Sequence, residues 1–435
     1  MHFKIHRGAN EIGGTCIEIW TETGHVVLDI GMPLVNPDKS KFDSSSISNL
    51  SKEQLIATGV LPDIPGLFIA KGEKEFGVVL SHAHQDHFGL AGFIHRDCKF
   101  YLGAATHKLI DLTGTFSHGS WNINHFHHFK SGEPFMIGDL EFTPYLMDHS
   151  AFDAYAFLVK SNGRTLFYSG DFRHHGRKAK VFDWFTHHIE QNIDYLLMEG
   201  TTIGRPTGKF KSEEEIESEF ENHFRENKGI TFIYTSGQNI DRIVSVYKAC
   251  KRAQKILAVD FYIANVLKEL SIFNSLPFPS STFPEIRVFF PFRLAKMILG
   301  QGKPMLLYRF SKYKITKNEI RSNPEKIVMI VRPSMQKDIH YLKNIEGGRF
   351  IYSMWEGYLQ EDKTRVFVDY LASRGLSIHN LHTSGHADEE TLKRMVDAIR
   401  PKSLVPIHTF NGAAYQKIFP DVNVRLVKNG EVVEI

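Results

Sequence analysis

The run Gly77-Val78-Val79-Leu80-Ser81-His82-Ala83-His84-Gln85-Asp86-His87 decides the fold of this 435-residue chain. Its first four residues are apolar and predict a buried strand that ends where the polar side chains begin. Four metal-binding side chains follow within six residues, in the pattern HxHxDH. Because alternate residues point the same way, His82 and His84 can share one ion while Asp86 and His87 fold back. We expect a loop at the strand's carboxyl end that holds two divalent ions side by side.

Further candidate donors stand at the ends of other predicted strands. His149, Asp171 and His408 each follow an apolar, strand-like run. Asp29 also ends such a run, and an acid at this place commonly orients metal ligands and loop amides. These downstream residues count against the alternative in which residues 82–87 are only solvated loop histidines.

The donors divide by chemistry into two sets. We expect one ion to be bound by His82, His84 and His149, a second by Asp86, His87 and His408, and Asp171 to touch both. Open positions on such ions are typical of catalytic rather than structural zinc. Mixed imidazole and carboxylate ligation without thiolate predicts two divalent ions, with Zn²⁺ favoured and Mn²⁺ also suited.

Composition limits the class of protein. With 42% hydrophobic and 23% charged residues, the chain is typical of a soluble globular protein, and its length favours two domains. No stretch approaches the roughly 18 apolar residues of a membrane span, and the amino terminus lacks the apolar core of a signal peptide. Three widely spaced cysteines form neither a disulfide framework nor a CxxC metal site. We expect a cytoplasmic protein without a membrane partner.

Residues 201–379 differ in pattern and charge from the rest. Strands alternate with helices here, which predicts an inserted α/β domain with a parallel sheet. The segment holds 28 Lys and Arg against 19 Asp and Glu, and residues 303–343 hold ten against three. This excess suits a polyanionic substrate, and the alternative is a merely solvated face.

Some local expectations concern single elements. We expect helices over residues 89–94 and from Asp388 to about Ile399, a helix that begins at Ser236-Gly237-Gln238, and a final hairpin that turns at Asn429-Gly430. Residues 115–130 carry histidines at four positions: His118, His125, His127 and His128. A surface loop is favoured there over a third metal site, because no ligand spacing repeats.

The donor series, with Asp29 ahead of it, resembles the motif series of the metallo-β-lactamase fold. The inserted domain, together with Glu199, His386 and His408, resembles the three extra motifs of the β-CASP nuclease branch of that fold. The runs Gly59-Val60-Leu61-Pro62-Asp63-Ile64 and Thr383-Ser384-Gly385-His386-Ala387 are most similar to bacterial ribonuclease J. The resemblance covers nearly the whole chain.

This resemblance implies a fold and a division into domains. The fold is α/β, an αββα metallo-β-lactamase sandwich with an inserted α/β β-CASP domain. The sandwich is expected over residues 1–200 and 380–435, and the insertion over residues 201–379. Ribonuclease J has a further carboxy-terminal domain, which we expect this chain to lack, so that a homo-oligomer is possible but not implied. Two local departures from the family are Thr409-Phe410, where relatives usually have an acid, and Glu199-Gly200-Thr201-Thr202.

The activity that the resemblance implies is two-metal-dependent cleavage of RNA, most simply single-stranded RNA. A hydroxide that bridges the ions would attack the phosphodiester, and Asp86 or Asp171 would accept its proton. His386 would act as general acid, with Glu199 holding its ring. The residues expected to bind substrate phosphate, through backbone amides or a helix start, are Thr383, Ser384, Gly385, His386 and Ser236.

Three alternatives are open at this point. A DNA nuclease of the same branch is the nearest, although a His at the position of His408 is typical of the RNA-acting members. Small-ester hydrolases share the fold but need no long cationic segment. Inactive scaffolding subunits of the branch typically have eroded ligands, and none is eroded here. The mode of cleavage, endonucleolytic or 5′-exonucleolytic, is left open.

Overall fold

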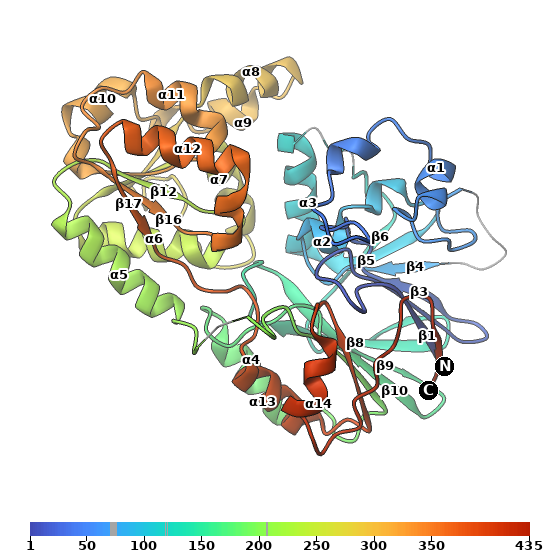
Figure 1. Ribbon diagram of the computed structural model, residues 1–435. Helices are drawn as coiled ribbons and strands as arrows, with labels where there is room; N and C mark the ends of the chain where they lie inside the picture. Colours follow the sequence, from blue (N-terminus) through green and yellow to red (C-terminus); the bar gives the residue numbers. More distant parts are fainter. Residues whose placement is uncertain (70–75, 118, 120, 206–207) are drawn as a thin grey trace. The chain divides into compact units, whose positions relative to one another are not determined.

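The computed structural model describes residues 1–69, 76–117, 119, 121–205 and 208–435, and it divides into two compact units (Figure 1). The first unit comprises residues 1–111, 120–209 and 385–435, and the second comprises residues 112–119 and 210–384. Both boundaries fall a few residues later than the expected ones, and the short segment 112–119 is an addition to the second unit. No helix in the described ranges is long and apolar enough to cross a membrane.

Two sheets make up the first unit. The strands of one sheet are β1 (His2–Arg7), β2 (Cys16–Trp20), β3 (His25–Leu28), β4 (Gly77–Val79), β5 (Lys99–Gly103), β6 (Phe126–Phe129) and β19 (Val432–Glu434). Those of the other are β7 (Phe135–Ile137), β8 (Leu140–Met147), β9 (Ala154–Ser161), β10 (Arg164–Tyr168), β11 (Tyr195–Glu199) and β18 (Ser403–Ile407). Their orders are β19-β1-β2-β3-β4-β5-β6 and β18-β11-β10-β9-β8-β7.

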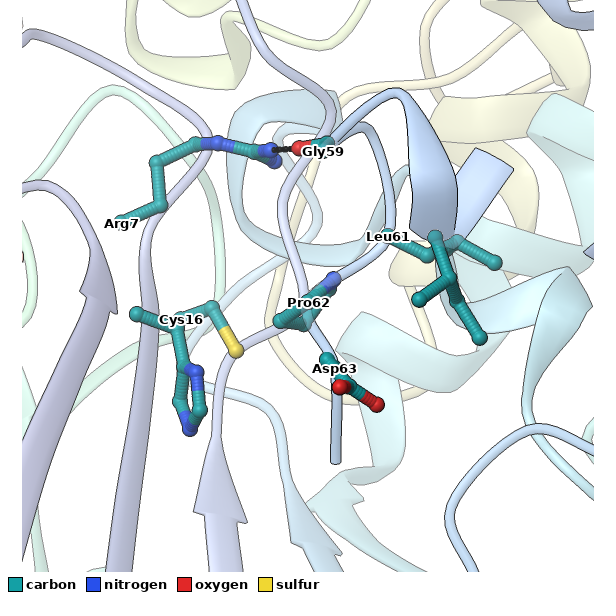
Figure 2. Close-up of a pocket in the computed structure, with 8 residues that line it drawn as sticks. Arg7, Cys16, Gly59, Leu61, Pro62 and Asp63 are labelled. Carbon is teal, nitrogen blue, oxygen red and sulfur yellow. Dashed lines mark hydrogen bonds between the residues drawn. The ribbon is translucent and has the colours of Figure 1, made fainter. Parts of the chain in front are cut away.

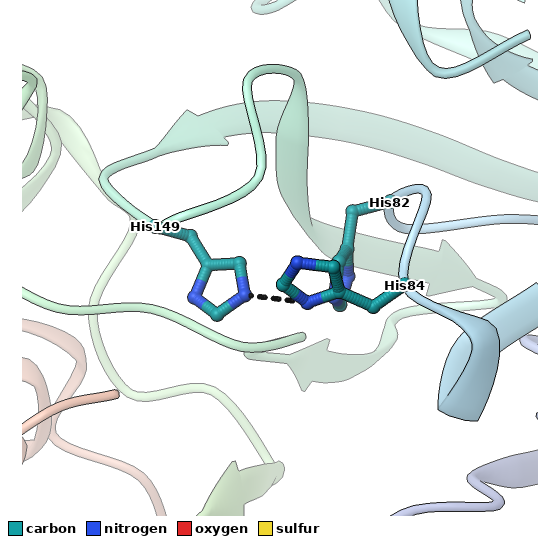
Figure 3. A group of neighbouring side chains, drawn as sticks. All are labelled: His82, His84 and His149. Atoms are coloured by element: carbon teal, nitrogen blue, oxygen red, sulfur yellow. Dashed lines mark hydrogen bonds between the residues drawn. The ribbon is translucent and has the colours of Figure 1, made fainter. Parts of the chain in front are cut away.

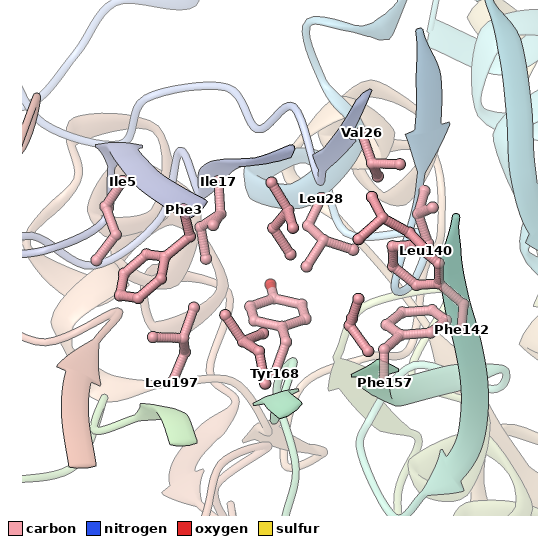
Figure 4. Packing of buried hydrophobic residues seen from close by; sticks show 14 of the residues in the cluster. Phe3, Ile5, Ile17, Val26, Leu28, Leu140, Phe142, Phe157, Tyr168 and Leu197 are labelled. Carbon is pink, nitrogen blue, oxygen red and sulfur yellow. The ribbon is translucent and has the colours of Figure 1, made fainter. Parts of the chain in front are cut away.

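The core of the first unit lies between these sheets (Figure 4). In β1, Phe3 and Ile5 are buried while His2 and Lys4 are partly exposed, which is the period-2 alternation of a half-buried strand. Side chains of both sheets, among them Leu28 of the first, meet in one cluster. The outer face of the six-stranded sheet packs against α4 (Ala179–His188), α13 (Glu389–Ile399) and α14 (Tyr415–Ile418). The layered α/β sandwich is as predicted.

The second unit is built around a parallel sheet. Its strands are β12 (Thr231–Tyr234), β13 (Ile256–Asp260), β14 (Ile286–Phe289), β15 (Ile327–Ile330), β16 (Arg349–Tyr352) and β17 (Ser377–Asn380), in the order β14-β13-β15-β12-β16-β17. All the pairings between these strands are parallel, as predicted. The central strand β15 is buried along its whole length, as expected where helices cover both faces of a sheet.

The remaining α-helices connect these strands. Those that precede β6 are α1 (Lys52–Ala57), α2 (Gln85–Phe88) and α3 (Ala104–Ser117), whose last turns from residue 112 on belong to the second unit. Those that follow β11 are α5 (Glu213–Glu226), α6 (Ile240–Arg252), α7 (Phe261–Leu270), α8 (Phe292–Gly300), α9 (Met305–Tyr308), α10 (Lys317–Ser322), α11 (Gln336–His340) and α12 (Asp362–Ser373). The helix expected after Asp388 is confirmed as α13, whose first-turn amide at Thr391 donates to the Asp388 carboxylate at 2.9 Å.

Two expectations for the segments that follow the HxHxDH pattern of residues 82–87 are wrong. The helix expected over residues 89–94 is only a 3-10 turn at Ala91–Phe93, because the regular helix α2 starts earlier and ends at Phe88. Residues 115–130 are not a plain loop, since α3 reaches Ser117 and β6 pairs in parallel with β5. β6 is an edge strand whose first three residues are exposed, so its polar sequence did not indicate a strand. His118 lies outside the described residues.

Two further expectations are wrong at element ends. The helix expected from Ser236 begins only at Ile240, because Asn239 is its cap and accepts a hydrogen bond from the amide of Arg242. The last strand does not form a hairpin with the segment before it. β19 instead pairs antiparallel with β1, placing Val433 opposite Phe3, so both chain ends share one sheet.

Candidate metal centre

The HxHxDH pattern of residues 82–87, which we call the metal box, spans a loop and the start of a helix. β4 ends at Val79, His84 caps α2, and Asp86 and His87 lie in the first turn of that helix. Only His82 and His84 therefore lie in the expected loop. The helix turns the second half of the box away from the first, which separates the two pairs of donors.

Backbone hydrogen bonds hold α2 in place. The amides of Thr15, Ile30 and Met32 donate to the carbonyl oxygens of Asp86, His87 and Gln85 at 3.1, 2.8 and 2.8 Å. These bonds come from two neighbouring loops of the first sheet. A Cβ at Gly31 would overlap the Asp86 carbonyl oxygen, so only glycine allows this close approach.

His82, His84 and His149 form a cluster of three imidazoles, whose rings converge in Figure 3. His84 Nδ1 and His149 Nε2 lie 3.1 Å apart. His149 Nδ1 donates to the Gly385 carbonyl at 2.6 Å, and His82 Nδ1 lies 3.0 Å from Ser81 Oγ. These contacts leave the Nε2 atoms of His82 and His149 directed into the cluster.

Asp86, His87, Asp171 and His408 form a second cluster with two carboxylates. Asp171 Oδ2 lies 3.1 Å from His87 Nε2 and 3.9 Å from His82 Nε2, so this carboxylate faces both clusters. His408 Nε2 lies 3.4 Å from Asp86 Oδ2. The structure thus brings together all seven residues expected to bind metal, and their role as ligands stays a prediction.

Asp29 contacts the metal box and orients one of its histidines, as predicted from its position at the end of a strand-like run. Its carboxylate accepts hydrogen bonds from the Ser81 amide and the His87 ring, each at 2.7 Å, and from the Tyr168 hydroxyl at 2.6 Å. Asp29 itself has a positive φ of 56°, a conformation that non-glycine residues rarely adopt. The Asp29 bond fixes His87 Nδ1 as a donor and leaves Nε2 to face Asp171.

The two clusters differ in electrostatics. Burial, reinforced by neighbouring imidazoles, lowers the pKa of His82 and His149 well below the ordinary value, and burial lowers the pKa of His84 to about 4. Burial also works to lower the pKa of His87, but the Asp171 and Asp29 carboxylates raise it well above its usual range. The first cluster therefore offers neutral nitrogen donors, which is the form that binds metal.

The donor atoms fit divalent metal. His82 Nε2 and Asp171 Oδ1 are buried, and no hydrogen-bond partner reaches either atom within the described part of the chain. Buried polar atoms without a partner are costly, and a metal ion satisfies them. Neighbouring nitrogens on one tetrahedral zinc are about 3.3 Å apart, given Zn–N bonds of about 2.0–2.1 Å. The 3.1 Å separation of the His84 and His149 nitrogens is close to this value.

His386 and Glu199 lie beside the second cluster. His386 Nδ1 is 3.4 Å from Glu199 Oε1 and 3.7 Å from Asp171 Oδ2, and its ring stacks on that of His408. Burial acts to lower the pKa of His386, but the charges of Glu199 and Asp171 raise it. Glu199 is fixed in turn, since its carboxylate accepts from the Thr201 amide at 2.9 Å and the Ala387 amide at 3.3 Å.

These two residues also offer a different role. Asp171, Glu199, His386 and His408 form a third group of donors close enough to hold an ion. His386 could thus be a ligand rather than an acid, and metal content after its removal distinguishes the two roles.

Two residues that were not among the predicted site residues, Thr201 and Lys178, contact the metal donors or the loop that carries them. Thr201 Oγ1 lies 2.8 Å from His408 Nδ1, which leaves His408 Nε2 to face Asp86. The Lys178 ammonium donates to the carbonyl oxygens of His149, Ala151 and Phe152 at 3.1, 2.8 and 3.1 Å. The contacts of Lys178 could not be predicted from sequence, because they are made to backbone carbonyl oxygens and leave no side-chain pattern. Thr201 could have been suspected, because the sequence around it departs from the family pattern.

The expected phosphate-binding residues are divided between the units. Gly385 and His386 belong to the first unit, whereas Ser236, Thr383 and Ser384 belong to the second. The Thr383 hydroxyl donates to the Lys211 carbonyl at 2.6 Å. The Ser236 hydroxyl accepts from the Gln238 amide at 3.3 Å in a turn ahead of α6. Their phosphate-binding role stays a prediction.

A cavity of about 270 Å³ lies elsewhere in the first unit (Figure 2). Its lining includes Arg7, Cys16, Gly59 and the run Leu61-Pro62-Asp63, and the last four of these residues are part of the stretch similar to ribonuclease J. The Arg7 guanidinium donates to the carbonyl oxygens of Gly59 and Val60. This stretch therefore anchors a loop to β1, and it contributes no donor to either cluster.

Two domain models match the chain. Residues 69–209 match a beta-lactamase superfamily domain, and residues 373–415 match a Zn-dependent metallo-hydrolase RNA specificity domain. The first covers the donors from His82 to Asp171, and the second covers His386 and His408. These matches confirm the predicted resemblance to the metallo-β-lactamase fold.

Similar proteins include several ribonucleases J. That of Helicobacter pylori is 25% identical over 98% of this chain and 60% of its own length, and that of Mycoplasma genitalium 23% identical over 98% and 72%. An RNase J-like protein of Methanocaldococcus jannaschii is 22% identical over 95% and 93%. The fold matches a crystal structure of a protein of unknown function from Enterococcus faecalis, with a TM-score of 0.77, 21% identity and 99% of both chains covered. The resemblance to ribonuclease J is therefore confirmed, and the chain spans about 60% of the length of the Helicobacter relative.

Proposed function

We propose that this protein hydrolyses phosphodiester bonds of single-stranded RNA with divalent metal. The observation that carries the proposal is the position of His386 beside seven imidazole and carboxylate donors, of which five are buried and two, His84 and Asp86, are partly exposed. A proton donor next to a metal site suits a reaction with a poor leaving group, such as the alkoxide of a nucleotide. The relatives named ribonuclease J and the match to an RNA specificity domain support RNA as the substrate.

The donors would hold two ions. His82, His84 and His149 would bind one, Asp86, His87 and His408 the other, and Asp171 would touch both. Two such ions supply a nucleophile at neutral pH and neutralise charge that develops on the phosphate. Nitrogen and oxygen donors without thiolate favour Zn²⁺ and also suit Mn²⁺.

The chain's own residues would handle the protons. Asp86 and Asp171 are acceptors that lie on the metal side of the site, so either one can take the proton of the attacking water. His386 would contact the scissile phosphate and protonate the leaving oxygen. Glu199 would keep the imidazole in place, and it is itself held by two amides.

One assay tests this proposal. Single-stranded RNA and DNA of the same sequence, each with a 5′-phosphate or a 5′-hydroxyl, are incubated with the protein in Zn²⁺, Mn²⁺ or chelator. We expect RNA to be cleaved, cleavage to require metal, and DNA to be cleaved much more slowly. Equal cleavage of DNA would favour a DNA nuclease, and cleavage of neither would overturn the proposal. The 5′-end series also separates endonucleolytic from 5′-exonucleolytic action.

A further inference from the structure

A segment of the second unit combines positive charge with exposed apolar side chains. Residues 286–318 contain eight Lys and Arg and no Asp or Glu. They include the helices α8 and α9, which are joined by a short turn and lie at the margin of the second unit (Figure 1). We use "α8–α9 face" for the exposed side chains Phe292, Arg293, Lys296, Leu299, Met305 and Tyr308 together with Lys312.

The apolar members of this face are unusually exposed. Phe292 is 71% exposed, Met305 67%, Tyr308 58% and Leu299 44%. In α8 only Ile298 is fully buried. Phe292, Lys296 and Leu299 follow the spacing i, i+4, i+7, so they share one side of the helix, turned away from Ile298. Several large apolar side chains exposed within one short segment indicate an interaction site.

Six of the eight cationic side chains of the segment fall into two groups; of the other two, Lys303 donates to the Thr115 hydroxyl at 3.1 Å and Lys314 lies over the Phe290 ring. Arg287 is bound to Glu319 at 3.0 Å and Arg309 to Glu269 at 2.9 Å, and Lys317 lies 3.8 Å from Asp338. Arg293, Lys296 and Lys312 have no ion-pair partner anywhere in the described ranges. These three cations on and beside the exposed apolar side chains are available for an anionic partner.

The chemistry of the face favours a single-stranded polyanion. Aromatic rings such as Phe292 and Tyr308 stack on nucleobases, and nearby cations bind the phosphates between them. A second copy of the chain fits less well, because the side chains that define the face include three cations and no acid, and in a two-fold dimer they would meet the same cations. The combination of rings and unpaired cations is what single-stranded nucleic acid requires.

We propose that the α8–α9 face binds single-stranded RNA, with bases on Phe292 and Tyr308 and phosphates at Arg293, Lys296 and Lys312. The inference rests on the proposed function, since it assigns part of the RNA to a surface that lacks the metal donors. RNA long enough to occupy both the face and the metal centre then binds more tightly than a short one. The face contributes to affinity and leaves the chemical step unchanged.

The test uses two double variants of the full, metal-loaded chain, Phe292→Ser/Tyr308→Ser and Arg293→Glu/Lys296→Glu. Matched controls are Ile272→Ser, at a residue that is 67% exposed in the same unit, and Lys248→Glu on α6. Binding of a long unstructured RNA and of a dinucleotide is measured by fluorescence anisotropy in a His386→Ala background. Hydrolysis of a small activated phosphodiester, bis(p-nitrophenyl) phosphate, is measured in the parent background.

Each double variant should bind the long RNA roughly tenfold more weakly, as expected for lost stacking or lost phosphate contacts. Binding of the dinucleotide and hydrolysis of the small ester should not change, and neither control should differ from the parent. Unchanged affinity for long RNA in both double variants would overturn the inference. It would also be overturned if the variants dissociated a dimer in sedimentation, or lost binding to anionic phospholipid vesicles, while RNA binding stayed intact.

The same data separate this inference from the proposed function. If the parent cleaves RNA and the double variants bind it normally, the inference fails and the proposed function stands. If the parent cleaves no RNA but the double variants lose affinity for it, the face binds RNA and the assigned activity is wrong.

Discussion

The two clusters of metal donors in the first unit and the α8–α9 face of the second unit differ in how their polar side chains are held. In the clusters, His87 is buried and each of its nitrogens has a specific partner, Asp29 at 2.7 Å and Asp171 at 3.1 Å. On the face, Phe292 and Tyr308 are exposed and Arg293 carries no ion pair among the described residues. The first arrangement fixes atoms in one geometry, as chemistry requires. The second leaves side chains free to adapt, as recognition of variable sequences requires.

This difference predicts separate effects of substitution. Changes in the clusters should alter metal content or the rate of the chemical step. Changes on the face should alter affinity for long RNA and its dependence on salt. A substitution on the face that altered metal content, or one in the clusters that altered only affinity for long RNA, would contradict this difference.

The largest effect is expected for Asp171→Ala, because this carboxylate faces both clusters. The variant should lose more metal than His82→Ala, His84→Ala or any other single histidine variant, and RNA cleavage should fall with it. Elemental analysis after gel filtration measures the metal content. If the Asp171→Ala protein keeps two ions per chain, the carboxylate does not bridge.

The next largest effect is expected for His386→Ala. The cleavage rate should fall by about 10²–10⁴, the usual scale of a lost general acid, while both ions and RNA affinity are retained. Single-turnover kinetics and elemental analysis measure the two quantities, and His340→Ala, at an exposed histidine, is the control. Loss of metal in His386→Ala would assign His386 to the third donor group instead.

Glu199 tests whether this acid has a positioning partner. Glu199→Gln should slow cleavage less than His386→Ala, because the imidazole keeps a hydrogen-bond partner but loses its charge. The double variant should cost little more than His386→Ala alone, since residues that act as a unit are not additive. Full additivity of the two losses, seen in single-turnover rates, would mean that Glu199 acts independently of His386.

A smaller effect is expected for Lys178→Met. Lys178 holds the loop that carries His149 through three backbone carbonyl oxygens. Loss of a group that orients a ligand commonly costs about 10–100-fold in metal affinity or activity. Metal titration against a competing chelator measures the affinity, with the exposed neighbour Lys180→Met as control. Affinity equal to the parent's would show that the loop holds its shape without Lys178.

The smallest effect is expected for the triple variant Lys312→Glu/Lys314→Glu/Lys317→Glu. Affinity for RNA should fall less steeply with salt, by about 0.7 in log–log slope for each lost phosphate contact. Lys317 already lies near Asp338, and Lys314 lies over the Phe290 ring, so Lys312 should contribute most. A slope equal to that of the parent would identify the basic segment as a solvated face.

The site was more predictable from sequence than its surroundings. His82, His149, Asp171 and His408 could be found because each follows an apolar strand, and strand ends that meet at one edge of a sandwich bring such residues together. Their imidazole or carboxylate character then predicted which donors share an ion. Thr201 could be suspected only as a departure from a family pattern, and Lys178 could not be found, because it acts through backbone carbonyl oxygens.

The fold was less predictable where burial and sequence pattern disagree. β6 was missed because it is an exposed edge strand, and the end of the chain was misassigned because β19 pairs with the distant β1. For α8, too, the exposure of its side chains could not be predicted from the sequence. Its sequence has apolar residues that a buried helix would also have, and only the structure shows that Phe292 and Leu299 face solvent.

We propose that metal held by the two donor clusters is required for RNA cleavage. The most direct test strips the protein with chelator and titrates Zn²⁺ back, with bound metal and the single-turnover rate of single-stranded RNA cleavage measured on the same samples. We expect no cleavage without metal and a maximum rate when two ions are bound per chain. Full cleavage by the stripped protein, or a maximum at one ion per chain, would contradict this proposal.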